Sequence, residues 1–306
     1  MCGLFGVFAK DNLSDADRKV FKQLAVVSTL RGVDSTGIAV FDVKERLYDT
    51  FKKPLNAMDF LQLDTVNRLV NQRGYNILAG HTRAATMGGI TQSNSHPFDY
   101  NPVIGMHNGT LRNKFELHGA NKYETDSEAI MASLLQSEKP IETISLLRGA
   151  WALVWMDWRT DSLYFLRNEE RTLFYTFSKD RQKIYWASEE AMLQLILDRN
   201  GIEYNEITLF EEDVLYRLPV INKKTKFQVS KCEGKPPVVY SNPVKNYFLE
   251  DYSEGTYGSP FKTYTHNSAY IDDVCAWCDT NGHPLHGRVS LGKGEFVCKD
   301  CAQLPE

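Results

Sequence analysis

Short apolar segments, separated by a few segments of helical periodicity, make up the first two thirds of this chain. In the segment 15–30 apolar residues recur every three or four positions, as on the buried face of a helix. The same criterion predicts further helices at 59–71, 126–136 and 189–197. Short apolar segments predict strands at 3–9, 37–41, 46–51, 75–81, 103–106, 150–156, 163–166, 173–176 and 183–187. Asn108-Gly109 is typical of a turn, so we expect the strand at 103–106 to end there.

The pattern changes after about Leu218. Residues 219–270 include the pair Pro236-Pro237 and show little periodicity, which is typical of a connector. Residues 271–306 contain two Cys-x-x-Cys pairs, which indicate a separate small module. We therefore expect a domain at 2–218, a connector at 219–270 and a module at 271–306.

The composition permits one large core with a small appendage, because the 306 residues are 42% hydrophobic. The net charge of −4 gives no general basic excess for nucleic acid, although a local basic patch is compatible with it. We find no run of about 18 apolar residues and no secretory signal pattern, so we expect no membrane span. The six cysteines are not spaced as in a secreted disulfide framework, which favours a reducing, cytoplasmic setting and leaves Cys232 as an unpaired structural residue.

Cys2 directly follows the initiator methionine. A methionine before a small residue is normally removed, which would leave the cysteine at the amino terminus. Its thiol, with a pKa of roughly 8.5, and an α-amine, with a pKa of about 7.7–8.0, would then belong to one residue. A nucleophile whose base is the terminal amine is a recognised catalytic arrangement. The alternative is an ordinary second residue at a chain end.

Three further segments offer the polar groups that such chemistry needs. Arg83 follows a predicted strand and can bind a carboxylate through two parallel hydrogen bonds. The side-chain amide of Asn108 and the N–H group of Gly109 can point at one oxygen, as an oxyanion hole requires. Asp126 opens a predicted helix. Taken singly, these segments are equally compatible with a surface arginine, a hairpin turn and a helix cap.

Seven short motifs, taken together and in order, are far more specific than any one of them. They are MCGLFG (1–6), RGVDSTGIA (31–39), GHTR (80–83), SHPF (95–98), HNG (107–109), TDSE (125–128) and GAWAL (149–153). Over roughly residues 2–215 the chain resembles the class II glutamine amidotransferases, which are N-terminal nucleophile hydrolases, and looks closest to the glutaminase domain of glucosamine-6-phosphate synthase. The resemblance implies an α+β fold, a four-layer α-β-β-α sandwich with two stacked antiparallel sheets.

The resemblance also implies a role for each matching residue. Cys2 would attack the side-chain amide carbon of L-glutamine, with its own α-amine as general base and then as acid toward the departing ammonia. Asn108 and the Gly109 N–H would stabilise the tetrahedral oxyanion. Arg83 would bind the α-carboxylate of the substrate and Asp126 its α-ammonium group, which would select a free amino acid. A thioester intermediate would then react with water, and this chemistry needs no cofactor.

Other residues of the motifs are expected to have supporting roles. Thr86 is assigned to the substrate carboxylate, and Arg31 to the substrate site and the surroundings of the nucleophile. Asp34 and Ser35 are expected to be structural.

Two features depart from the family pattern. Ala84 and Met87 occupy places where the family usually has a bulky aromatic residue and a histidine, which puts the gating of ammonia in doubt more than glutamine hydrolysis. The chain also has no room for the synthase domains that follow in this family, and it has no Walker-type motif. We therefore expect the ammonia to pass to a separate synthase protein, unless the chain is a plain glutaminase.

The C-terminal cysteines have the spacing of a zinc site. Cys275-x-x-Cys278 and Cys298-x-x-Cys301 are separated by nineteen residues (279–297), which fits the pattern of two zinc knuckles. Four thiolates complete a tetrahedral structural Zn²⁺ site with no open position for catalysis. We therefore expect a zinc-ribbon-like module whose folding depends on the metal.

Alternatives to this site stay open. His283 or His286 could replace one thiolate, or the cysteine pairs could be redox-active. The module is expected to dock a protein or nucleic acid, and the nearby basic residues permit nucleic acid without indicating it. They are Arg288, Lys293 and Lys299.

Three functions compete for the whole chain. The first is a glutamine amidotransferase subunit that supplies ammonia to a partner. The second is a catalytically silent scaffold that binds protein or nucleic acid through its zinc module. The third is hydrolysis of another amide by the same fold. The presence of both Arg83 and Asp126 argues against the third, and the intact set of site residues favours the first.

Overall fold

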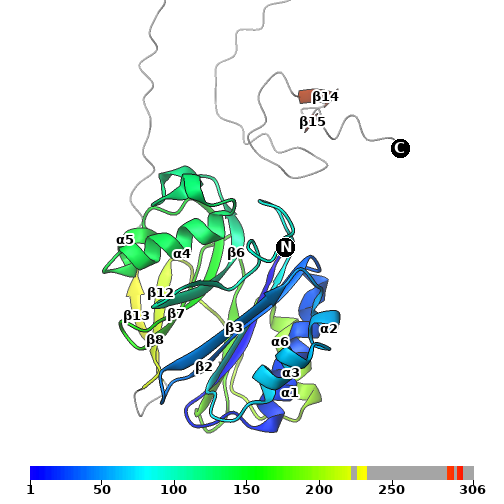
Figure 1. Cartoon of the computed structure of the whole chain (residues 1–306), viewed down its shortest axis with the longest axis vertical. Helices are drawn as coiled ribbons and strands as arrows, with labels where there is room; N and C mark the ends of the chain where they lie inside the picture. Colours follow the sequence, from blue (N-terminus) through cyan, green and yellow to red (C-terminus); the bar gives the residue numbers. More distant parts are fainter. Residues whose placement is uncertain (222–225, 233–287, 293–294, 299–306) are drawn as a thin grey trace, which may run out of the picture. The chain divides into compact units, whose positions relative to one another are not determined.

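The structure, a computed structural model, describes residues 1–221, 226–232, 288–292 and 295–298 (Figure 1). The chain divides into two compact units, Met1–Tyr240 and Ser241–Glu306. The division falls inside the segment 219–270, which the sequence predicts to be a connector and most of which lies outside the described residues.

The first unit contains a seven-stranded sheet in which every neighbouring pair of strands is antiparallel. Its strands, in spatial order, are β11 (Thr208–Leu209), β9 (Phe174–Phe177), β10 (Lys183–Ala187), β1 (Gly3–Ala9), β4 (Ile77–Arg83), β2 (Ser35–Asp42) and β3 (Leu47–Lys53). The strands predicted at 3–9 and 183–187 have the predicted bounds, and those predicted at 37–41 and 46–51 are confirmed as the hairpin β2–β3.

The strand β1 lies at the centre of this sheet and is buried along its whole length. Gly6 permits this close packing, because a Cβ atom at that position would lie 2.1 Å from the ring of Trp186. From its third residue the chain therefore runs through a central, fully buried strand, and not along an edge of the sheet.

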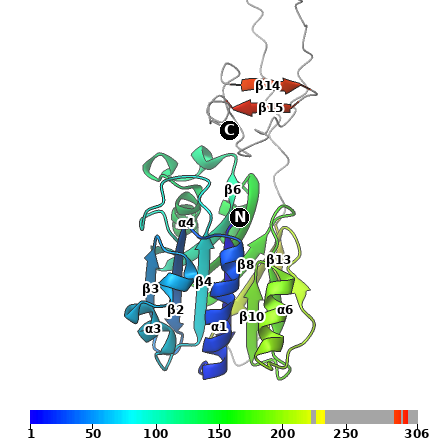
Figure 2. The same cartoon turned by 90° about the vertical axis from the view of Figure 1, so that its right-hand side faces the viewer.

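Helices cover the outer face of the seven-stranded sheet (Figure 2). They are α1 (Asp15–Val27), α2 (Ala57–Phe60), α3 (Asp64–Asn71) and α6 (Glu190–Arg199). Ser14 and Asp17 form a capping box that starts α1, and the predicted helix at 15–30 ends in the 3₁₀ turn Ser28–Leu30. The prediction of a single helix at 59–71 is wrong, because the helix is interrupted between α2 and α3. There the side chain of Asn67 donates to the carbonyl of Leu61 at 3.0 Å.

The second sheet has six strands, again all antiparallel. In spatial order they are β13 (Gln228–Lys231), β12 (Val214–Pro219), β8 (Ser162–Arg167), β7 (Gly149–Asp157), β6 (Val103–Leu111) and β5 (Phe98–Tyr100). The helices α4 (Asp126–Gln136) and α5 (Pro140–Ile144) pack on its outer face, together with the 3₁₀ turns Lys114–Glu116 and Ala120–Lys122. The helix predicted at 126–136 is confirmed with its predicted bounds.

The strand β6 contradicts the predicted turn at Asn108-Gly109. It continues through both residues to Leu111, because Asn108 pairs with Ala152 and Gly109 with Trp151 of β7. The long-range pairing with β7 overrides the local turn preference of the Asn-Gly pair. Both residues are therefore held in a sheet and not at a flexible loop tip.

The two sheets face each other across a shared hydrophobic core, so the unit is a mixed α/β sandwich with helices outside both sheets (Figure 1). Phe165 and Trp186, from opposite sheets, meet edge to face with ring centroids 5.2 Å apart. Fully burying a large apolar side chain contributes roughly 1.5–3 kcal/mol. The layer between the sheets is therefore a rigid support for groups at its ends.

In the second unit the described residues form the antiparallel hairpin β14 (Arg288–Gly292) and β15 (Glu295–Cys298). Cys275, Cys278 and Cys301 lie outside the described residues, and Cys298 is described only as the last residue of β15. The zinc site therefore stays a prediction. Across the described ranges, no helix is both long and apolar enough to cross a bilayer.

Candidate active site

The pairing of β1 with β4 brings Cys2 next to Arg83. Gly3 pairs with Thr82 across the two strands, so the residue before Gly3 and the residue after Thr82 are neighbours. Leu4 belongs to the core between the sheets, and side chains alternate along a strand. Cys2, two positions before Leu4, therefore faces the layer between the sheets.

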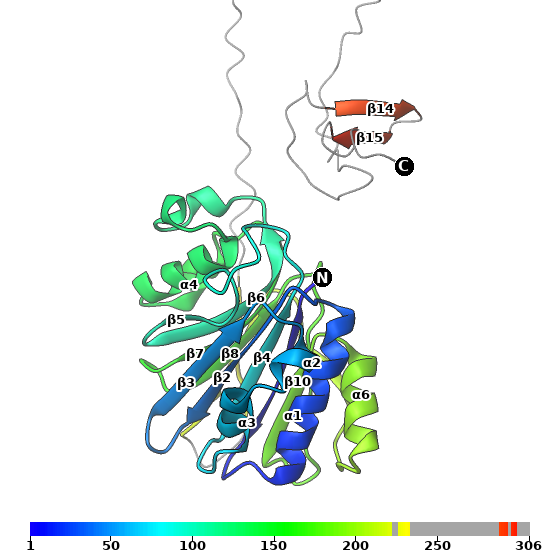
Figure 3. The ribbon, with the colours of Figure 1, turned by 45° about the vertical axis from the view of Figure 1, so that its right-hand side comes forward.

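Asn108 reaches the same end of the sandwich from the other sheet. It lies two positions after Met106, whose side chain belongs to the core between the sheets. The Nε2 atom of His81 in β4 lies 3.0 Å from the carbonyl oxygen of His107 in β6, which joins the two sheets beside Asn108. The candidate site is thus at the end of the inter-sheet layer where the N-terminus lies (Figure 3).

The thiol of Cys2 is almost buried, with 9% of the residue exposed. The Ala84 N–H donates to Sγ at 3.4 Å, and Sγ lies 3.5 Å from the Ala84 carbonyl oxygen. Burial raises the pKa of the thiol, and Asp126 acts in the same direction. The Ala84 hydrogen bond, the N-terminal charge and Arg83 act to lower that pKa, but burial outweighs them. A raised pKa disfavours the thiolate, so the thiol needs a base to become the nucleophile.

Arg31 holds the backbone of Cys2. Its guanidinium is buried, its Nε donates to the Cys2 carbonyl oxygen at 2.7 Å, and its Nη1 forms an ion pair with Glu189. Its Nη2 lies 3.9 Å from the sulfur of Met1. Burial lowers the pKa of Arg31, although the Cys2 thiolate would raise it. These contacts fit the predicted support of the nucleophile, whereas the predicted contact of Arg31 with substrate stays a prediction.

Arg83 is 3% exposed and organises the loop that follows β4. Its Nη1 donates to the Gly89 carbonyl at 2.9 Å and its Nη2 to the Met87 carbonyl at 2.6 Å. Its Nη2 also donates to the Gly88 carbonyl at 3.3 Å. Burial lowers the pKa of Arg83. The charges of Cys2, Asp34 and Asp126 act in the opposite direction, which shows that the cation lies near these groups. A guanidinium has five donors, which leaves two for a carboxylate beyond these three bonds.

Asn108 is buried, with 1% of the residue exposed. Its Nδ2 atom is buried and has no hydrogen-bond partner within the described part of the chain. A buried donor of this kind is unusual and calls for an explanation, and a site for a transient anion is one. The predicted role of Asn108 in an oxyanion hole is compatible with this geometry.

Gly109 fixes the backbone beside Asn108. Its φ is +154°, and a Cβ atom there would lie 1.9 Å from the carbonyl oxygen of Ala150 and 2.7 Å from Nε2 of His107. Glycine is therefore required at this position for β6 to approach β7, whatever the role of its N–H group.

Asp126 starts α4 without capping it. The N-cap is Thr125, whose hydroxyl accepts from the N–H of Glu128 at 3.2 Å, so the helix-cap alternative belongs to Thr125. The Asp126 carboxylate instead accepts from the N–H groups of Leu111 at 2.7 Å and Ser127 at 2.8 Å. These bonds place a buried negative charge just beyond the Asn108-Gly109 pair.

Thr86 and Asp34 both hold the loop after β4. The Thr86 hydroxyl lies 3.1 Å from the hydroxyl of Thr110 in β6. The Asp34 carboxylate accepts from the N–H of Ala85 at 2.7 Å, in agreement with its predicted structural role. The loop that carries Ala84 to Cys2 is therefore fixed from both sheets.

Sequence reasoning missed the residues that support the site from a distance. Ser188 and Glu189 contact the chain's first residues and Arg31 from the junction of β10 and α6. Neither belongs to a motif, and only the position of Glu189 at the start of a predicted helix could have drawn attention to it. The rings of His81 and His96 are tilted against each other with centroids 3.8 Å apart, and burial lowers the pKa of His81 to about 3.

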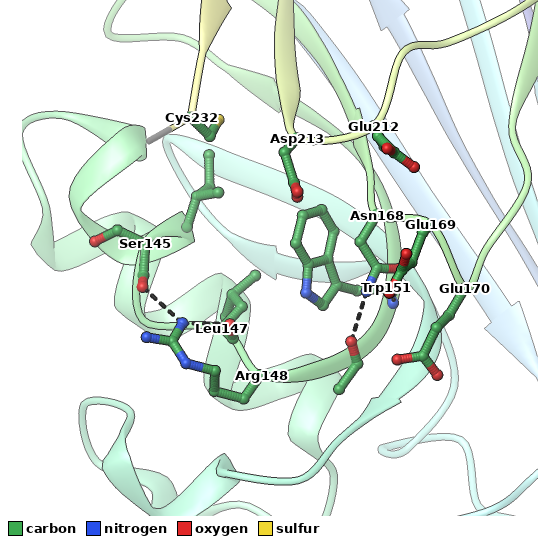
Figure 4. A pocket seen from close by; sticks show the side chains of 12 residues that line it. Ser145, Leu147, Arg148, Trp151, Asn168, Glu169, Glu170, Glu212, Asp213 and Cys232 are labelled. Atoms are coloured by element: carbon green, nitrogen blue, oxygen red, sulfur yellow. Dashed lines mark hydrogen bonds between the residues drawn. The ribbon is translucent and has the colours of Figure 1, made fainter. Parts of the chain in front are cut away.

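A separate cavity of about 490 Å³ lies on the outer side of the six-stranded sheet (Figure 4). Its lining includes Arg148, Trp151, Glu169, Glu170, Glu212, Asp213 and Cys232. Burial raises the pKa of the Cys232 thiol to about 11, and Cys232 is free, as predicted. The residues of the candidate active site do not line this cavity.

The comparison with known families identifies the class of protein to which this fold belongs. The family model described as class-II glutamine amidotransferases matches residues 1–219. This chain belongs to the class II glutamine amidotransferases. The match includes every residue predicted for the glutaminase site, from Cys2 to Asp126.

Individual relatives are distant and longer. The chain is 30% identical over 212 residues to an amidophosphoribosyltransferase of Methanocaldococcus jannaschii, covering 63% of this chain and 43% of that protein. It is 32% identical over 176 residues to a glutamine–fructose-6-phosphate aminotransferase (isomerizing) of Methanococcus maripaludis, covering 50% of this chain and 28% of that protein. The chain thus spans less than half the length of these two curated relatives.

Solved structures confirm the fold. A glutamine phosphoribosylpyrophosphate amidotransferase from B. subtilis matches with a TM-score of 0.56 and 20% identity, covering 75% of this chain and 49% of that chain. A structure described as the allosteric regulatory enzyme of purine biosynthesis matches with a TM-score of 0.58 and 19% identity over the same shares. At these identities the likeness concerns the sandwich fold alone.

Proposed function

We propose that this chain hydrolyses L-glutamine to glutamate and ammonia through a thioester on Cys2, and that the ammonia passes to a separate synthase protein. The observation that carries the proposal is that a thiol, a guanidinium and a carboxylate converge at one end of the sandwich. Cys2 and Arg83 are neighbours across β1 and β4. Asp126 accepts from the N–H of Leu111 at 2.7 Å, at the end of the strand that carries Asn108. Membership of the class II glutamine amidotransferases supports the same chemistry.

The raised pKa of the Cys2 thiol calls for a base, and the α-amine of the same residue is the group that removal of Met1 would create. Met1 is 68% exposed and therefore accessible for removal. The amine takes the thiol proton as Sγ bonds to the side-chain amide carbon of glutamine. It then returns a proton to the departing nitrogen, which leaves as ammonia, and water later releases glutamate from the thioester.

The charges on either side of Cys2 suit the two ends of a free amino acid. Arg83 would bind the α-carboxylate with the donors that its loop contacts leave over, and Thr86 would assist. Asp126 would bind the α-ammonium group. Nδ2 of Asn108 and the N–H of Gly109 would bind the oxyanion, for which the buried Nδ2 has no competing partner among the described residues.

The test is glutamate formation by protein lacking Met1, as checked by mass spectrometry. Cys2→Ala should abolish the activity, and Cys232→Ala, which removes the other described free thiol, should leave it intact. If wild type without Met1 forms no glutamate even with the proteins that copurify with it, the silent-scaffold function replaces this one. Activity that survives in Cys2→Ala would contradict the thioester mechanism.

The C-terminal module is part of the proposal. Cys275, Cys278, Cys298 and Cys301 would hold one structural Zn²⁺, for which the support is the cysteine spacing and the hairpin that ends at Cys298. The metal would stabilise the module and take no part in glutamine hydrolysis. We expect about one zinc per chain by elemental analysis, and less in Cys298→Ser than in the matched Cys232→Ser variant.

A further inference from the structure

The first residues of the chain are held by the junction between β10 and α6. The N–H of Leu4 donates to the Ser188 hydroxyl at 2.9 Å, and the N–H of Ser188 donates to the Leu4 carbonyl at 2.8 Å. Ser188 is 2% exposed, so both bonds are shielded from water. This pair fixes the chain two residues after the nucleophile.

The next residue of the junction, Glu189, reaches the nucleophile itself through Arg31. The Arg31 guanidinium connects the Glu189 carboxylate to the carbonyl oxygen of Cys2, which it bonds at 2.7 Å. The Arg31 side chain is 5% exposed and that of Glu189 37% exposed. A buried cation needs a counter-charge, and Glu189 provides it from 158 positions along the chain.

Glu189 is not used for the purpose that its position suggests. It is the N-cap residue of α6, but its side chain makes no capping hydrogen bond. Serine, threonine, aspartate and asparagine are preferred there, so a glutamate turned toward Arg31 has no local explanation. Glu190, the next residue, is exposed and has the same charge at the same helix end.

We infer that Glu189 is a positioning residue for the Cys2 nucleophile and acts through Arg31. The inference deepens the proposed function and rests on it. Once Met1 is removed, Cys2 has no preceding residue, and the contact of Arg31 with the Met1 sulfur is lost as well. The Ala84 N–H still bonds the thiol. The backbone of Cys2, and with it the amine, is held at the carbonyl by Arg31, whose guanidinium Glu189 keeps in place.

The experiment compares Glu189→Gln with Glu190→Gln, since both remove one negative charge from the start of α6. A misplacement of about 1 Å can cost about 10²-fold in rate, so we expect kcat for glutamate formation to fall about 10–100-fold in Glu189→Gln, with KM within about threefold of wild type. Glu190→Gln should match wild type. Glu189→Asp, which keeps the carboxylate, should recover part of the lost kcat.

A second measurement does not depend on turnover. The rate at which iodoacetamide alkylates Cys2, followed on the N-terminal peptide by mass spectrometry, should fall in Glu189→Gln and stay at the wild-type value in Glu190→Gln. Equal alkylation rates and equal kcat in the two variants would overturn the inference. If wild type forms no glutamate, the proposed function fails, and the alkylation rates alone still decide the role of Glu189.

Discussion

The side-chain amide of Asn108 allows catalysis and folding stability to be separated by one substitution. Its Nδ2 is buried and has no hydrogen-bond partner in the residues that the structure describes. Leaving such a donor unpaired costs about 1–3 kcal/mol of folding free energy. Leucine has nearly the same shape without the polar groups, so Asn108→Leu removes this cost while keeping the packing of β6 against the facing sheet.

Asn108→Leu should raise the thermal stability of the protein and lower its activity. In a domain of this size, 1 kcal/mol shifts Tm by roughly 2–4 °C, so the Tm should rise by roughly 2–12 °C. The variant also lacks one donor to the oxyanion, so kcat for glutamate formation should fall about 10²–10³-fold, or about 2.7–4 kcal/mol in activation free energy. Calorimetry and steady-state kinetics on the same preparation measure both.

Asn76 provides the matched control. It is 6% exposed, but its Oδ1 accepts from the Val43 N–H at 3.2 Å and its Nδ2 donates to the carbonyl of Asp11. Asn76→Leu should therefore lower Tm and leave kcat per folded molecule unchanged. If Asn108→Leu lowers Tm as Asn76→Leu does, or lowers kcat less than about tenfold, the assignment of Asn108 to the oxyanion is refuted.

Three further predictions concern Gly109, Arg83 and Asp17. Gly109→Ala would place Cβ 1.9 Å from the Ala150 carbonyl, so its Tm should fall sharply, and an unchanged Tm would show that β6 adjusts. Arg83→Lys keeps the charge without the planar fork, so the KM for glutamine should rise at least about tenfold in initial-rate assays, whereas an unchanged KM would exclude contact with the carboxylate. Burial alone would raise the pKa of Asp17, but hydrogen bonds, above all the one from Lys183, lower this pKa below 3.8. The ionised carboxylate therefore stabilises the fold above that pH, and the stabilisation is lost in acid. Asp17→Asn should be less stable at pH 7 and show a flatter acid limb in urea titrations at several pH values, and a parallel limb would contradict this.

The sequence predicted the parts of the fold that local patterns encode. The central strand β1 and the helix α4 have their predicted bounds because the local pattern of apolar residues determines each of them. The sequence failed where a distant partner decides. Asn108-Gly109 would favour a turn in isolation, but its pairing with β7 holds it in a strand. The strand β13, in the segment predicted as a connector, exists by pairing with β12.

The same distinction applies to the candidate site. The motifs identified Cys2 and Arg83, since their chemistry is visible in the residue types and their order. Glu189 is invisible in this way, because its partner Arg31 lies 158 positions away and nothing in the local sequence connects them. Sequence motifs thus point to the residues that are proposed to act on substrate, whereas the contact between Glu189 and Arg31 is visible only in the tertiary structure.

The departure at Ala84 can now be placed within this arrangement. Two backbone groups of Ala84, its N–H and its carbonyl oxygen, lie 3.4 and 3.5 Å from Sγ of Cys2. The replacement of a bulky aromatic residue by alanine therefore leaves the contact with the nucleophile intact. What alanine cannot provide is a side chain large enough to cover the site. In the proposed function, the acceptor protein would supply this cover and keep ammonia from solvent.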